Sequence, residues 1–92
     1  TSIRGYFNIP GDWNVKATDD PGLPFFNPSN KTDNVRIMVG NPNNPNPIMQ
    51  GPYVRDQING LYMTPGGTRI PGGNPATVGD THIPLNDYVF SR

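Results

Sequence analysis

The sequence contains no cysteine and no glutamate, and it has few of the residues that favour helices. The missing cysteines exclude a disulfide-stabilised mini-protein and a cysteine-based zinc site. Alanine occurs twice, leucine three times and lysine twice in 92 residues, whereas asparagine, proline and glycine together account for 35. Because proline and glycine disfavour helices and strong helix formers are scarce, the composition excludes a helical bundle.

Clustered positive charge and long apolar runs are also missing. Seven Lys and Arg balance seven Asp, and the cations are scattered singly along the chain. Binding to nucleic acid needs a clustered positive surface, so we expect no nucleic-acid partner. The longest apolar runs have three or four residues, such as Ile37-Met38-Val39, and no basic run accompanies them. We therefore expect no membrane partner either.

The residues that are present favour strands. Val, Ile and Thr together number 20, and the chain has nine aromatic residues. They lie in short runs that Pro, Gly and Asn separate, and these three residue types favour turns. The pattern predicts one small domain over residues 1–92, mostly β or irregular, with four to six short strands, long Pro/Gly/Asn-rich loops and little or no helix.

The individual strands are predicted from alternation and from the turns that bound them. Residues 1–34 are loop-rich, with one strand of moderate quality at 3–9. The best strand is 35–39, because Val35, Ile37 and Val39 alternate with residues of mixed character. Further strands are expected at 76–78 and at 88–90.

The strongest local signal is a hairpin over residues 53–64. Asn59-Gly60 separates two strand-like runs, and both residues tolerate the positive φ that such a turn needs. The alternative is one helical turn capped by Gly60. The Asn-Pro segment 41–47 is either an extended polyproline-type connector or a series of Asn-initiated turns. After it, a repeated Pro-Gly-Gly predicts two tight turns within 65–92, before the last strand.

The hydrophobic content is small for a self-sufficient core, since only 33% of the residues are hydrophobic. We therefore expect a partly extended chain whose order depends on a partner surface. Large aromatic side chains either fill the thin core or anchor such an interface. The pair Phe25-Phe26, isolated between prolines, favours an anchor in a neighbour's pocket. The candidate anchors are Trp13, Phe25, Phe26, Tyr53, Tyr62, Tyr88 and Phe90. The candidate edge for strand pairing with a neighbour consists of Val35, Ile37 and Val39.

Catalytic chemistry is weakly represented. His82 and Asp80 would face the same way on a strand, but together they make half a site, and the simpler interpretation is that Asp80 bonds a loop amide. The Asp residues of the N-terminal half lack the spacing of a calcium loop, so turn and cap hydrogen bonds are expected for them: Asp12, Asp19, Asp20 and Asp33. Asn30-Lys31-Thr32 matches a glycosylation sequon. We expect no catalytic residue, no metal, no cofactor and no enzyme activity.

The function expected from these features is structural. The chain would dock on a larger protein shell or tube, or on copies of itself as a homo-oligomer, and stabilise it. In length and composition it resembles the cement, decoration, minor capsid or tail proteins of viruses, phages especially, which implies a place in the virion. The alternatives are an extracellular carbohydrate-binding or adhesive β module, with Trp13 and several tyrosines on one exposed face, and one module of an extracellular filament.

Overall fold

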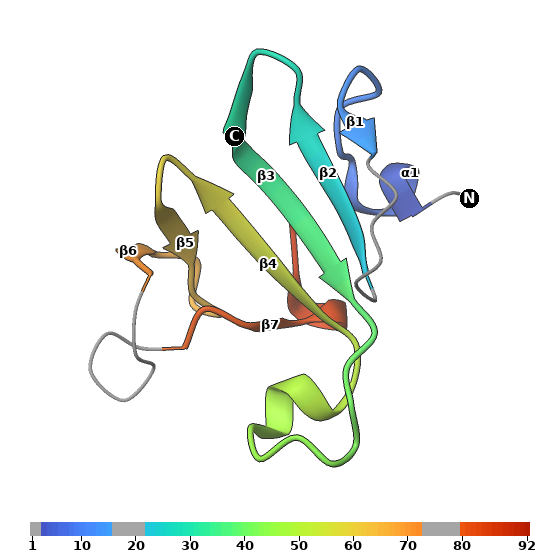
Figure 1. Cartoon of the computed structure of the whole chain (residues 1–92), viewed down its shortest axis with the longest axis vertical. Coiled ribbons are helices and arrows are strands. Elements are labelled where there is room, and N and C mark those ends of the chain that lie inside the picture. Colours follow the sequence, from blue (N-terminus) through green and yellow to red (C-terminus); the bar gives the residue numbers. More distant parts are fainter. Residues whose placement is uncertain (1–2, 16–21, 73–79) are drawn as a thin grey trace.

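The structure is a computed structural model that describes residues 3–15, 22–72 and 80–92. These residues form one antiparallel sheet in the order β1-β2-β3-β4-β5-β6, and β7 pairs with the start of β4, at Tyr53 and Val54, whereas β5 pairs with its end (Figure 1). The predicted mostly β fold with little helix is confirmed. In chain order the elements are α1 (Ile3–Phe7), β1 (Asn14–Val15), β2 (Leu23–Asn27), β3 (Asn30–Met38), the 3-10 helix η1 (Pro47–Gln50), β4 (Tyr53–Ile58), β5 (Leu61–Met63), β6 (Arg69–Pro71), β7 (Ile83–Pro84) and the 3-10 helix η2 (Leu85–Asp87).

The predicted hairpin is present as β4 and β5. Ile58 pairs with Leu61 across the turn, and Asn59 and Gly60 adopt positive φ values of 51° and 82°. Two successive residues with positive φ are what a tight type I′ hairpin turn requires. The hairpin is thus correct, and the alternative of a capped helical turn is wrong.

The strand predicted at 35–39 belongs to the longer β3, which is not an edge. β3 pairs with β2 on one side and with β4 on the other, so that Val35 lies between Phe25 and Asp56. The predicted edge for pairing with a neighbour is therefore wrong at Val35 and Ile37, which are paired on both sides. Val39 follows the end of β3 and is exposed, so its role stays a prediction. The prolines on either side of Phe25-Phe26 do not isolate that pair from the sheet. Both phenylalanines pair with β1 on one side and with β3 on the other.

Two predicted strands at the ends of the described chain are also wrong. Residues 3–7 form the short helix α1, and Asn8 follows it with a left-handed φ of 60°, the conformation in which helices commonly end. At 88–90 no strand forms, because η2 turns the chain and the Tyr88 amide donates to the Leu85 carbonyl. The last strand is instead β7. The predicted fragment at 76–78 lies outside the described residues.

The Asn-Pro segment folds as a series of Asn-initiated turns rather than as an extended connector. The amides of Asn43, Asn46 and Ile48 each donate to the side-chain oxygen of the asparagine two residues earlier, at 2.9, 2.9 and 3.0 Å. The last of these bonds caps η1. The first Pro-Gly-Gly turn is closed by a bond from the Gly67 amide to the Thr64 carbonyl, and the second extends into residues outside the described part.

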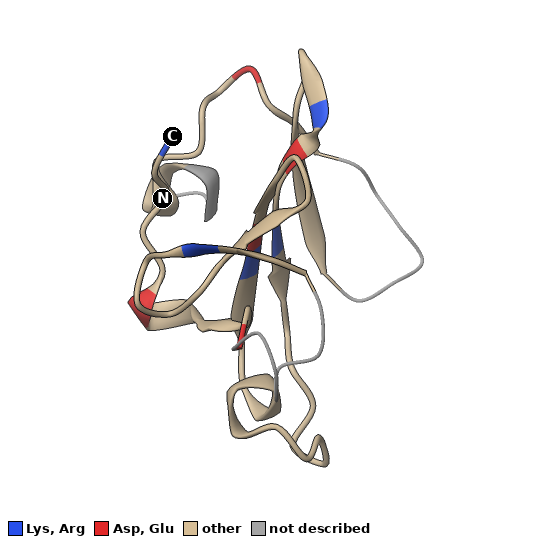
Figure 2. Cartoon of the chain, turned by 90° about the vertical axis from the view of Figure 1, so that its left-hand side faces the viewer, with Lys and Arg blue, Asp and Glu red and all other residues tan. Residues whose placement is uncertain are grey.

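The core lies on one face of the sheet. Side chains alternate between the two faces of a strand, so Val35 and Ile37 of β3 point to the same side as Val54 of β4. The N-terminal and C-terminal segments cover this side, and Figure 2 shows both ends of the chain there. The hydrophobic core cluster consists of Phe7, Ile9, Trp13, Phe25, Val35, Ile37, Val54, Met63, Ile83 and Tyr88, with Leu85 and Phe90 packed against it. Tyr53 is also buried but lies outside this cluster.

Candidate functional site

Four of the seven candidate aromatic anchors are buried within their own chain. Trp13, Phe25, Tyr53 and Tyr88 are 3–6% exposed, whereas Phe26, Tyr62 and Phe90 are half-buried. The sheet brings Trp13, Phe25 and Tyr88 into the core, and the Trp13 and Phe90 rings meet edge to face at 5.3 Å. Phe25 is thus a core residue rather than an isolated anchor. A role for any of the seven in binding a partner stays a prediction.

A buried ionic cluster, which sequence reasoning missed, lies beside this core. Asp56 on β4 has no exposed surface, and Arg69 and Arg92 both pair with it at 2.8 Å. Arg92 binds both carboxylate oxygens of Asp56, because its second terminal nitrogen donates to Oδ2 at 3.0 Å. The Tyr88 hydroxyl donates to the same Oδ2 at 2.6 Å. Asp56 therefore has the multiple charged and neutral donors that a buried carboxylate needs.

Asp33 extends the cluster to β3. It is buried, it accepts a bond from Arg92 Nε, and Asn27 Nδ2 donates to its other oxygen at 3.1 Å. The expected turn or cap role for Asp33 is therefore wrong. The sequence contained a signal for the burial of both acids, because side chains two positions apart on a strand point to the same face. Asp33 therefore shares a face with Val35, and Asp56 shares one with Val54.

The cluster has a structural rather than a chemical character. Burial and the neighbouring Asp56 carboxylate raise the pKa of the Tyr88 hydroxyl well above its usual range, so the phenol stays neutral. Burial alone would lower the pKa of Arg92, but its bonds to Asp56 and Asp33 raise it, so the guanidinium stays charged. The neutral phenol and the charged guanidinium groups surround a carboxylate without exposed surface, so the cluster stabilises the core.

His82 and Asp80 form a local pair, as the simpler interpretation predicted. The His82 backbone amide and its Nδ1 atom both contact Asp80 Oδ1, at 2.8 and 2.7 Å. Burial raises the pKa of Asp80, but the bonds from His82 and from Asn46 outweigh it and hold that pKa below its usual value. Among the described residues, no three His, Cys, Asp or Glu side chains gather as a metal site would require.

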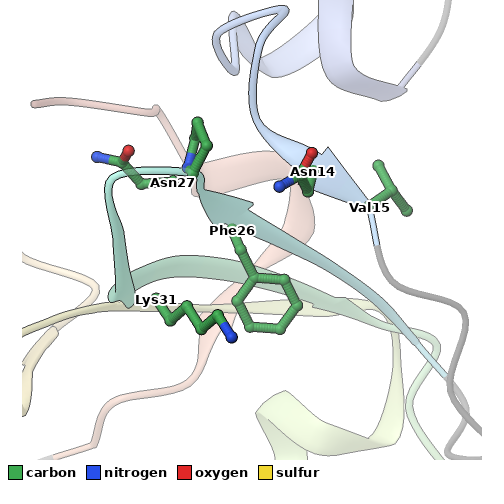
Figure 3. A pocket seen from close by; sticks show the side chains of 6 residues that line it. Asn14, Val15, Phe26, Asn27 and Lys31 are labelled. Carbon is green, nitrogen blue, oxygen red and sulfur yellow. The ribbon is translucent and has the colours of Figure 1, made fainter.

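A hollow at the β1 edge of the sheet is the candidate docking site. Its volume is about 400 Å3, and more of its lining is apolar than polar. Figure 3 shows Val15 projecting from β1, with the Phe26 ring and the Lys31 side chain side by side. The lining residues are Asn14, Val15, Phe26, Asn27, Pro28 and Lys31. Of these, only Phe26 was a candidate from the sequence, because strand pairing is what brings 14–15 beside 26–31.

Comparison with known proteins gives no family. No family model matches the chain, and no curated protein and no solved structure matches it. Within the described part of the chain, no helix has the length and hydrophobicity needed to cross a bilayer. Function is therefore argued from this chain's own surface.

Proposed function

We propose that the chain is a structural assembly protein that docks on a larger protein shell or tube. The specific proposal is a cement, decoration, minor capsid or tail protein of a virus or phage, located in the virion and without enzyme activity or a cofactor. The hollow beside β1 is the observation that carries this proposal. Charge supports a protein partner over nucleic acid, since the formal net charge is zero and Figure 2 shows the positions of Lys and Arg spread along the chain.

The position of the hollow suits strand addition. Within the described residues β1 pairs on one side only, with β2. An edge strand offers unpaired backbone groups to an extended segment of another protein, and a pocket beside it takes one of that segment's side chains. Val15 on β1 is 44% exposed, and Phe26 lines the same hollow. The edge predicted from the sequence at 35–39 is thus replaced by β1.

The occupant we propose is an extended segment of the shell protein with a large apolar side chain. Such a side chain would bury apolar surface against Val15, Phe26 and Pro28, which gives most of the binding free energy. The ammonium group of Lys31 would remain at the rim, where charged groups set orientation more than affinity. A second copy of this chain is the other occupant that the homo-oligomer hypothesis allows.

The exposed aromatic face expected for the carbohydrate-binding alternative does not form as predicted. That hypothesis placed Trp13 with several tyrosines on one exposed face, but Trp13, Tyr53 and Tyr88 are buried. Stacking on a sugar ring needs an accessible aromatic face, so the structure gives this alternative no specific support. A role as one module of an extracellular filament has no observation in its favour either.

Reconstitution on the particle tests the proposal. The chain would be mixed with particles assembled from the shell or tube protein whose gene lies beside its own, and cosedimentation would be measured. We expect the wild type to cosediment and Phe26→Asp to lose most of its binding, because a carboxylate would face the apolar wall. Val89→Asp is the matched control, since Val89 is exposed and lies outside the hollow.

Circular dichroism of each variant before mixing confirms that it is folded. Cosedimentation of both variants at the wild-type level would refute the hollow as the docking site. The absence of any shell or tube gene beside this one, or a wild-type chain that stays in the supernatant, would refute the proposed function.

A further inference from the structure

We infer that the sheet face opposite the core carries a binding site for an oxyanion, between Arg36 of β3 and Arg55 of β4. No residue lines both this site and the hollow beside β1, and the inference does not depend on the proposed function. The two arginines are direct partners in the β3–β4 register. Like charges placed directly opposite each other across two strands destabilise a sheet, so a bound anion would relieve a repulsion that the fold itself creates.

The charges of these two arginines are not balanced by the chain. Arg69 and Arg92 take up the buried carboxylates of Asp33 and Asp56. Among the described residues no carboxylate lies within ion-pair distance of Arg36 or Arg55. Two arginines that are paired across the strands and have no acid beside them among the described residues leave a local charge of +2.

Arg55 is held in place by neutral groups. One of its terminal nitrogens donates to the Thr81 hydroxyl at 3.0 Å, and its guanidinium lies 4.4 Å from the centre of the Tyr62 ring. Its Nε is buried without a hydrogen-bond acceptor. These contacts fix the position of the cation without neutralising it, so the group is preorganised for an anion.

The surroundings set the chemical class of the ligand. The arginines share a polar hollow of about 160 Å3 with the side chains of Asn34, Gln57 and Tyr62. This set contains amide and guanidinium donors and no carboxylate. Guanidinium groups bind the paired oxygens of carboxylate, sulfate or phosphate through two parallel bonds. The small volume suits such a group itself, whether it is a free ion or the carboxylate of an acidic side chain on another protein.

Nuclear magnetic resonance of the arginine side chains tests the site. The Nε–Hε signals of the folded, full-length chain would be followed during titration with sulfate, phosphate and acetate, with chloride as the reference at equal ionic strength. We expect saturable shifts for Arg36 and Arg55. The signals of Arg69 and Arg92 serve as internal controls and stay unchanged, because those groups are bound to buried acids.

Two variants distinguish specific anion binding at this site from nonspecific electrostatic attraction of anions to the chain. Arg36 is exposed, so Arg36→Gln should fold, and we expect it to weaken the anion affinity at least tenfold. Lys31→Gln removes the same charge elsewhere on β3, outside this hollow, and should leave the affinity unchanged. Saturation by acetate assigns the site to a protein carboxylate, and saturation by sulfate or phosphate alone assigns it to a tetrahedral ion. Shifts that grow linearly with every salt, or that persist in Arg36→Gln, would overturn the inference.

Discussion

At the scale of single residues, Asp56 is a buried carboxylate whose charge and hydrogen bonds depend entirely on neighbouring side chains. A carboxylate without solvent contact has to be neutralised and hydrogen-bonded by the protein itself. Arg69 of β6 does this together with Tyr88 and Arg92 of the C-terminal segment. The loss of any one partner leaves a charge or a polar atom buried without compensation, so single substitutions in this cluster should have large effects on stability.

The first prediction concerns Asp56→Asn. The amide has nearly the same shape, but it leaves Arg69 and Arg92 without their shared counter-charge. We expect the free energy of unfolding to fall by about 3–5 kcal/mol, the usual effect of breaking a buried ion pair. Urea denaturation measures it. The matched control is Asp12→Asn at an exposed position, which should change the stability by less than about 0.5 kcal/mol. Equal effects of the two variants would contradict the structural role of the cluster.

The second prediction concerns pH and Tyr88. Burial beside Asp56 raises the pKa of the folded Tyr88 hydroxyl above the ordinary value of 10.0. Below pH 10 the phenol is neutral in both states, and its contribution to stability is fully present. Above pH 10 the unfolded chain loses the proton and the folded chain keeps it, so stability decreases as the pH rises.

Urea denaturation between pH 8 and 11.5 would measure this slope. In Tyr88→Phe the contribution of Tyr88 to the slope should vanish, and stability near pH 7 should decrease by about 1.5–3 kcal/mol, because a hydrogen bond to a charged group is lost. An unchanged alkaline slope in Tyr88→Phe would show that other groups cause it.

At the scale of elements, the turns hold the strands in register. Gly60 and Gly40 both adopt positive φ, at 82° and 80°. The space around Gly60 is open, whereas a Cβ on Gly40 would clash with the Gly51 carbonyl oxygen. The first glycine is required for its conformation alone. The second is also required because two backbone segments meet there, at the two ends of the Asn-Pro loop.

The third prediction compares these two glycines. Gly60→Ala should lower the free energy of unfolding by about 1–2 kcal/mol, because a residue with a side chain is strained in the left-handed conformation. Gly40→Ala should cost about 2–5 kcal/mol, since the steric conflict with Gly51 adds to the same conformational term. Thermal denaturation of both variants, measured side by side, checks the order. A Gly40→Ala protein as stable as Gly60→Ala would show that the Asn-Pro loop relaxes freely.

How well each element could be predicted depends on how local its cause is. The β4–β5 hairpin depends on Asn59-Gly60 and was correct. The helix α1 was missed because its helical signal is weak, and Phe7 packs against the distant Tyr88 ring at 5.4 Å. The edge was misplaced because pairing between Phe25 and Val35 cannot be read from either segment alone. The docking hollow was missed for the same reason, since its lining residues come from β1, β2, the turn after β2 and the start of β3.

At the scale of the whole molecule, one sheet face and two chain segments make the core, and its ten buried hydrophobic residues come from most of the elements. The Cα radius of gyration is 12.7 Å, close to the value of about 13 Å expected for a compact domain of 100 residues. Support by a partner, which the thin hydrophobic content indicates, stays a prediction.

The fourth prediction follows from docking. A partner that binds only the folded chain stabilises it by mass action, so the melting temperature of the chain should increase when it is bound to its particle. For the free chain we expect a low melting temperature, below roughly 50 °C, which is near the lower end for stable domains. Circular dichroism at several concentrations measures the free chain. A sharp transition that is independent of concentration, and unchanged on the particle, would contradict the need for a partner.

The buried ionic cluster also has a consequence for the order of folding events. The β4–β5 hairpin joins residues three or five positions apart, whereas the bond from Arg92 to Asp33 spans 59 positions and the bond to Asp56 spans 36. Contacts with long sequence separation form late, because the loop has to close first. The cluster should therefore be absent from the transition state, and Arg92→Gln should accelerate unfolding while leaving the refolding rate nearly unchanged. The cluster would thus set how long the folded chain persists rather than how fast it forms.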